Sequence, residues 1–110
     1  MEAKELRIGN WVNFKFSNLS SNVMICYNDL RNFERNIQIG QFNNIYTPIP
    51  LTEEWKDKIE YNEYIRIDMI GFIIYSNGHQ YHFSVNDYPY VHQIQNLYLA
   101  LTNEELTIKQ

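Results

Sequence analysis

The sequence predicts one α+β domain over residues 1–110: a small antiparallel, partly barrel-like unit, then a C-terminal β-hairpin, with two helices packed on the sheet. Three observations favour this class. The 110 residues, 45% of them apolar, suit one hydrophobic core and are too few for two domains. Short alternating segments occupy the first half of the chain. Two helical patterns, each opened by a capping signal, lie in the second half.

The β-rich segment covers residues 1–47. The Gly9-Asn10 pair is typical of a tight turn. Residues 11–16 then alternate, with Val12 and Phe14 on one face, which indicates a strand.

A polar loop is expected over residues 17–22, and a second strand over residues 23–27 that includes the lone Cys26. Residues 29–35 fit either a helical turn or a loop, and residues 36–46 allow one or two short strands. Pro48 and Pro50 end the segment, since proline lacks the donor that a sheet ladder needs.

The first helix is predicted over residues 52–61. Thr52 is a natural N-cap, and Glu53 and Glu54 favour the positive end of the helix dipole. Trp55 and Ile59 are four residues apart and share the buried face, and Asn62 is expected to end the helix in the left-handed conformation.

The segment over residues 63–85 predicts a strand followed by a hairpin. The alternation of apolar and polar residues shifts by one position at Met69-Ile70, which indicates a bulge or a turn from Asp68 to Gly71. Asn77-Gly78 is the strongest short hairpin signal.

A two-residue loop at Asn77-Gly78 fixes the register from Ser76 opposite His79 to Phe72 opposite Phe83. This register sorts the hairpin into an apolar face and a mixed face. The apolar face collects Ile70, Phe72, Ile74, Tyr81, Phe83 and Val85, and the mixed face collects Ile73, Tyr75, Gln80, His82 and Ser84.

The second helix is predicted over residues 88–101, with Asp87 as its cap and Pro89 in its first turn. Its apolar arc runs through Tyr90, Ile94 and Leu101, whereas the opposite arc is expected to face outward. A short tail over residues 102–110 follows, with a capping-box pattern at 102–105 and a short terminal strand at 106–108.

Charge is distributed unevenly along the chain. From residue 71 to residue 103 the only formally charged side chain is Asp87, although a solvent-facing stretch normally carries mixed charge. Tyrosine and neutral polar residues bind surfaces at low desolvation cost, although Asn-rich codon usage along the whole chain is an alternative explanation. The candidate interaction surface comprises Tyr75, Gln80, His82, His92, Gln95, Asn96 and Leu99, and a second copy of the chain fits it as well as a foreign protein does.

Catalytic and metal chemistry is not expected. His79 and His82 point to opposite faces of the hairpin and cannot share an ion. Cys26 sits in an apolar strand pattern, where a thiol is usually inert. The pairs Glu53/Glu54 and Glu104/Glu105 fit helix starts. We therefore expect no enzyme, no metal and no cofactor.

The alternative function is an SH3-like or OB-like nucleic-acid-binding protein that uses the N-terminal β unit. Trp11 and Phe42 could stack on bases, and the cations available are Lys4, Arg7, Lys15, Arg31 and Arg35. Four nearby acidic side chains offset them, and phosphate affinity needs uncompensated cations.

With no apolar run long enough to cross a membrane and no leader pattern, a cytoplasmic location is expected.

Three stretches carry a family resemblance: residues 5–10 (ELRIGN), residues 48–55 (PIPLTEEW), and residues 90–102 (YVHQIQNLYLALT) with 104–107 (EELT). The chain resembles a family of small proteins, without established activity, seen in Bacteroidetes genomes and their prophages and mobile elements. It departs from the family pattern at residues 60–62 and at Asn103. The resemblance implies a phage or mobile-element setting and no catalytic residues. Together with the charge pattern it leads us to expect a non-enzymatic protein-interaction module that serves as an accessory protein of a phage or mobile element.

Overall fold

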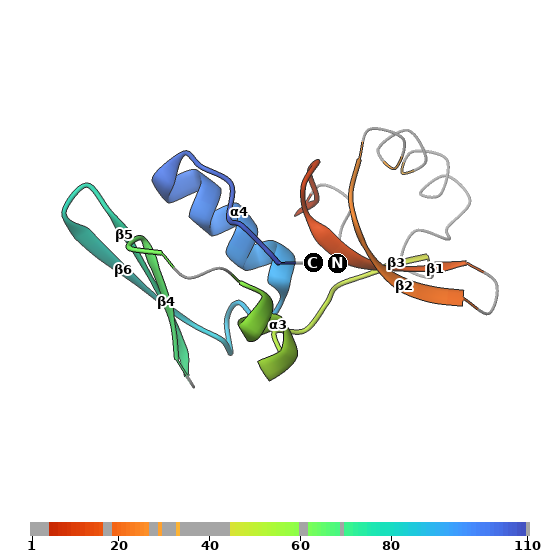
Figure 1. Ribbon diagram of the computed structural model, residues 1–110, viewed down its shortest axis with the longest axis horizontal. Coiled ribbons are helices and arrows are strands. Elements are labelled where there is room, and N and C mark those ends of the chain that lie inside the picture. The colour runs from red at the N-terminus through yellow and green to blue at the C-terminus, as the bar shows by residue number, and fades with distance from the viewer. Residues whose placement is uncertain are drawn as a thin grey trace. The chain divides into compact units, whose positions relative to one another are not determined.

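The computed structural model describes residues 5–16, 19–26, 29, 33, 45–59, 62–68 and 70–109. These residues form two antiparallel three-stranded sheets and two helices (Figure 1), which confirms the α+β class. The chain divides into two compact units, Met1–Ile49 and Pro50–Gln110. The division falls between Pro48 and Pro50, where the sequence ends the β-rich segment. That both units belong to one domain stays a prediction.

The first unit contains a sheet of order β2-β1-β3. Its strands are β1 (Trp11–Phe16), β2 (Leu19–Met24) and β3 (Tyr46–Thr47), and β1 pairs antiparallel with both neighbours. Within the described residues this sheet is not closed into a barrel.

Strand β2 corrects the expected loop over residues 17–22 and the expected strand over 23–27. The β1–β2 ladder runs from Trp11↔Met24 to Phe16↔Leu19, so the polar residues 19–22 are part of the strand. Exposed edge positions tolerate polar side chains, and cross-strand pairing therefore outweighs their low strand propensity. Of residues 29–35 and 36–46 only four positions are described; the other residues of these two predictions lie outside the described part of the chain.

The core of the first unit forms around β1. Its buried members are Leu6, Val12, Ile25, Phe33 and Tyr46, and Phe14 packs against them, as expected for the Val12 face. The turn at Gly9-Asn10 is confirmed: Gly9 has φ 98°, and the Asn10 Oδ1 accepts a hydrogen bond from the Arg7 backbone N–H at 2.9 Å.

The second unit contains a sheet of order β4-β5-β6. Its strands are β4 (Ile65–Ile67), β5 (Gly71–Ser76) and β6 (His79–Ser84), and its helices are α3 (Glu53–Lys58) and α4 (Val91–Thr102). Helix α4 lies along one face of this sheet (Figure 1). Between them lies a core of Ile59, Ile65, Phe72, Ile74, Ile94, Tyr98 and Leu106.

The hairpin register predicted from Asn77-Gly78 is confirmed at every pair from Ser76↔His79 to Phe72↔Phe83. Asn77 (φ 52°) and Gly78 (φ 79°) both adopt positive φ, as a type I′ turn requires. This turn matches the twist of the two strands, so a local signal determines the pairing of the whole hairpin.

A tight turn joins β4 to β5, which confirms one of the two alternatives at residues 68–71. The Asp68 backbone N–H donates to the Gly71 carbonyl at 2.9 Å. The expectation that Ile70 belongs to the apolar inner face is wrong, because Ile70 lies in the turn and is 78% exposed.

Helix α3 begins as predicted and ends earlier. The Thr52 hydroxyl caps it by accepting from the Trp55 backbone N–H at 3.4 Å, and Trp55 and Ile59 are both buried. Asn62 is not the left-handed stop that was expected, since its φ is not positive. Its amide instead donates to the Tyr98 hydroxyl at 3.0 Å and ties this segment to α4.

Helix α4 begins later than expected, at Val91, with Tyr90 as N-cap. Asp87 is not the cap, because its backbone N–H donates to the Ser84 carbonyl at 3.1 Å in a turn that precedes the helix. The Tyr90 backbone N–H is capped instead by the side chain of Gln93 at 3.1 Å.

The end of α4 corrects the capping box expected at residues 102–105. Asn103 is a left-handed C-cap with φ 60°, so Glu104 and Glu105 follow a helix end and do not begin a helix. The expected terminal strand is reduced to a single bridge between Ile108 and Ile59.

Candidate functional site

The second sheet has two unlike faces because side chains alternate along each strand. Ile65, Phe72 and Ile74 point to the inner face and are buried with Ile94 and Tyr98 of α4. The opposite face, here called the outer face, carries Arg66, Ile73, Tyr75, Gln80, His82 and Ser84. Arg66, Gln80 and His82 are exposed, and Ile73 and Tyr75 are half-buried.

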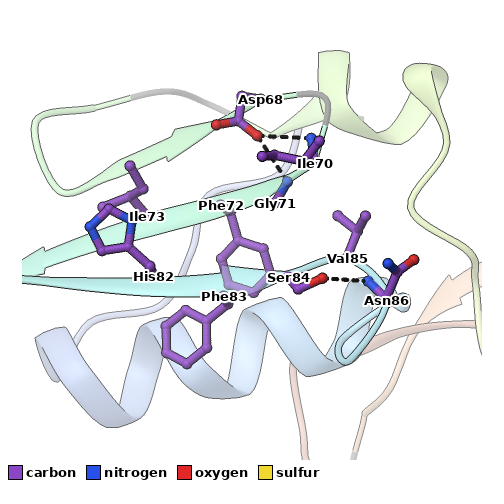
Figure 2. A pocket seen from close by; sticks show the side chains of 10 residues that line it. All are labelled: Asp68, Ile70, Gly71, Phe72, Ile73, His82, Phe83, Ser84, Val85 and Asn86. Atoms are coloured by element: carbon purple, nitrogen blue, oxygen red, sulfur yellow. Dashed lines mark hydrogen bonds between the residues drawn. The ribbon is translucent and has the colours of Figure 1, made fainter.

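A pocket of about 440 Å³ lies at one end of this sheet (Figure 2). The turn from Asp68 to Gly71 forms one side, and the end of β6 forms the other. The lining side chains are Asp68, Ile70, Phe72, Ile73, His82, Phe83, Ser84, Val85 and Asn86, together with the backbone of Gly71.

The pocket wall is held by hydrogen bonds of the Asp68 carboxylate. Its Oδ1 accepts from the backbone N–H of Ile70 at 2.9 Å and of Gly71 at 2.8 Å (Figure 2). The Val85 N–H donates to the Ile70 carbonyl at 3.1 Å and joins the turn to the other wall. The pocket therefore has a defined rim, on which the Ile70 side chain is exposed.

Gly71 is required by the close approach of β5 and β6. A Cβ atom at this position would collide with the carbonyl oxygen of Phe83. The rings of Phe72 and Phe83 stack with centroids 5.1 Å apart, so both the backbone and the side chains of the two strands pack tightly at the pocket.

The hairpin part of the candidate interaction surface is brought together. Tyr75, Gln80 and His82 share the outer face, as the register predicts. His79 lies on the other face beside Tyr81, with ring centroids 6.3 Å apart, which confirms that His79 and His82 diverge.

The helical part of that surface is not exposed as expected. His92 and Gln95 are each 1% exposed, and Asn96 and Leu99 are half-buried. The prediction that this arc of the helix faces solvent is wrong, because the buried part of α4 is wider than its stripe of apolar residues. The ring of His92 stacks on that of Tyr90, with centroids 6.0 Å apart. Helix α4 also packs on the inner face of the sheet, away from Tyr75, Gln80 and His82.

Sequence reasoning missed the pocket. Its exposed apolar residue, Ile70, was assigned to the core because it continued the alternation of β5. The available signal was the Asp68–Gly71 turn, which places an intervening side chain outside the strand pattern.

The Cys26 region differs from the expected apolar strand. Cys26 is exposed and follows β2. Its thiol donates to the Asp29 carboxylate at 3.2 Å, and the buried Tyr46 hydroxyl donates to the same carboxylate at 3.1 Å. Burial of Tyr46 and the neighbouring Asp29 raise the pKa of the Tyr46 phenol.

Among the described residues no group of three or more His, Cys, Asp or Glu side chains could hold a metal ion.

The residues proposed for base stacking and phosphate contact are described only in part. Trp11 is half-buried, and the Arg7 guanidinium donates to the neighbouring Ile8 carbonyl at 3.1 Å. Lys15 is exposed. Lys4, Arg31, Arg35 and Phe42 lie outside the described residues.

No protein-family model, curated protein or solved structure matches the chain. In the described part of the chain, no helix has the length and apolar content of a membrane-spanning segment.

Proposed function

We propose that this chain is a non-enzymatic protein-interaction module whose contact surface is the outer face together with the pocket. One observation carries the proposal: Ile70, 78% exposed, stands on the rim of a pocket of about 440 Å³ beside the outer face. Apolar side chains beside polar ones are typical of the central part of protein–protein contacts.

The partner is a protein segment that places an apolar side chain in the pocket, against Ile70 and Ile73. The polar side-chain groups of Tyr75, Gln80 and His82 then bond to polar groups of that segment. Tyrosine contributes large contact area at low cost in conformational entropy. In the setting that the family resemblance implies, the module acts in the cytoplasm as an accessory protein of a phage or mobile element.

The chemistry of the pocket supports binding over catalysis. Its titratable side chains are Asp68 and His82. One oxygen of Asp68 already accepts two backbone N–H groups and holds the turn. This is a structural task, and it leaves the carboxylate less available as a general base.

The test is selection of binders from a displayed library of random peptides, followed by variants of the chain. Ile70→Ser is expected to weaken the selected peptides at least tenfold, because the apolar contact at the rim is lost. The matched control is Leu19→Ser in β2, since Leu19 is 77% exposed and lies in the other unit; it should bind like the native chain. Equal binding by Ile70→Ser and the native chain would contradict the proposal.

A further inference from the structure

Strand β6 has one edge that no described strand covers, since it ends the order β4-β5-β6. In an antiparallel ladder alternate residues direct both their N–H and C=O groups toward the partner strand. Val85 faces β5, because its N–H bonds to Ile70. By alternation the backbone groups of Gln80, His82 and Ser84 point away from β5.

The uncovered edge ends at Ser84. The carbonyl of Ser84 already accepts from the N–H groups of Asp87 at 3.1 Å and Tyr88 at 3.0 Å. The backbone groups open to a new strand are therefore the N–H and C=O of Gln80 and of His82, and both residues are exposed.

Strand β6 lacks the usual protection of an edge. Proteins block such edges with lysine, proline, bulges or inward-pointing charges. The sequence of β6, HQYHFS, contains no proline and no formally charged side chain at pH 7. Its Tyr81 is also 37% exposed.

We propose that β6 pairs antiparallel with β6 of a second copy of this chain, around a two-fold axis at Tyr81. Gln80 then lies opposite His82 of the partner subunit, and each open N–H meets an open C=O. This pairing does not depend on the proposed function, because it uses the edge of the sheet and not the outer face.

The register follows from the groups that are open. If the pairing of the two β6 strands were shifted toward Ser84, it would need the Ser84 carbonyl, which is already bonded within the chain. If the pairing were shifted the other way, it would place Gly78 of the turn in the ladder. In the remaining register Tyr81 faces Tyr81 of the partner subunit in a non-hydrogen-bonded pair, where side chains approach most closely. Aromatic cross-strand pairs stabilise sheets, which accounts for the exposed ring.

A second copy fits this edge electrostatically. Two chains of net charge −4 repel each other, but β6 lies in the stretch from residue 71 to residue 103, in which Asp87 is the only formal charge. Pairing through β6 joins the copies where repulsion is weakest. The two sheets then form one continuous sheet whose outer faces point the same way, so that two pockets share one surface.

The first test is sedimentation equilibrium of the purified chain over a wide concentration range. The native chain should dimerise, and Gln80→Pro should weaken the dimer at least tenfold, because it removes an edge N–H from each copy. Gln80→Ala keeps that N–H and should weaken it no more than about threefold. Asn22→Pro, in edge strand β2, should leave the dimer unchanged. A native chain that stays monomeric, or a Gln80→Pro dimer as tight as the native one, would overturn the proposal.

A cross-linking test keeps the proposal falsifiable if Gln80→Pro does not fold. In a Cys26→Ser background, Tyr81→Cys places two thiols at the axis, within reach of a disulfide. His79→Cys places them at positions that are not opposite each other. Tyr81→Cys should form covalent dimers at least tenfold faster than His79→Cys, and equal rates would overturn the register. Neither readout involves peptide binding, so failure of the self-pairing and failure of the proposed function are distinguishable.

Discussion

The two hairpins of the molecule, β1–β2 and β5–β6, share a geometry and differ in their edge strands. Each pairs two six-residue strands, and each places an exposed strand at the end of a three-stranded sheet. On β2 the polar side chains bond across the ladder: the Ser20 hydroxyl donates to the Asn13 Oδ1 at 2.9 Å, and the Asn13 amide donates to the Asn22 Oδ1 at 3.2 Å. Strand β6 instead carries Tyr81, Phe83 and two histidines.

On β2, polar side chains bond to their neighbours across the ladder, whereas β6 carries aromatic side chains and histidines at the edge of its sheet. Polar pairs on β2 use their hydrogen-bonding capacity within the sheet. On β6, Tyr81, His79 and His82 are exposed, and the pocket lies at the end of the same strand. Both proposals of binding made above concern the second sheet.

The largest expected effect concerns the packing of β5 against β6. Gly71→Ala forces a Cβ atom against the Phe83 carbonyl and should destabilise the fold by about 3 kcal/mol, as overpacking does. Gly78→Ala is the matched control: its Cβ meets nothing within 4 Å, but the residue has φ 79°, so the cost should be about 1 kcal/mol. Urea unfolding measures both. An equal loss of unfolding free energy in Gly71→Ala and Gly78→Ala would show that β5 and β6 do not approach closely at Gly71.

A smaller effect compares one buried tyrosine of each unit. Tyr46→Phe removes a hydrogen bond to the Asp29 carboxylate and should cost about 2 kcal/mol, because bonds to charged groups are the stronger ones. Tyr98→Phe removes a bond from the neutral Asn62 amide and should cost about 1 kcal/mol. Urea unfolding of the two variants gives the order. A larger loss in Tyr98→Phe would contradict the role of Asp29.

The smallest effect is a pH dependence in the first unit. Burial and Asp29 raise the pKa of Tyr46 in the folded state, above the value of about 10 in an unfolded chain. The folded state therefore holds the phenol proton more tightly. The resulting stability is full below about pH 10 and is lost as pH rises toward the folded pKa. Melting temperatures above about pH 10 should fall more steeply for the native chain than for Tyr46→Phe, and parallel slopes would contradict this.

The sequence predicted the second unit better than the first because the two hairpins carry signals of different strength. Asn77-Gly78 demands positive φ at both positions, so the turn alone determines the register of β5–β6. No comparable pair precedes β2, and its polar residues 19–22 resemble a loop. Their place in a strand depends on the ladder with β1, which local propensity does not encode.

The positions of the candidate site residues could be predicted only where a single secondary-structure element determined them. Tyr75, Gln80 and His82 follow from the register, and they share the outer face. His92 and Gln95 did not follow from the helical pattern, because periodicity identifies the most apolar arc and not the full width that is buried. Ile70 was misplaced because a turn interrupts the strand alternation at that residue.

The most direct test of the account is a map of amide and methyl chemical shifts in the native chain, recorded as a selected peptide is added. We expect changes concentrated at Ile70, Ile73, His82 and Asn86, around the pocket and the outer face, with β1 and β2 unaffected. Changes concentrated on β1 and β2, with the pocket unmoved, would contradict the assignment of binding to the second sheet.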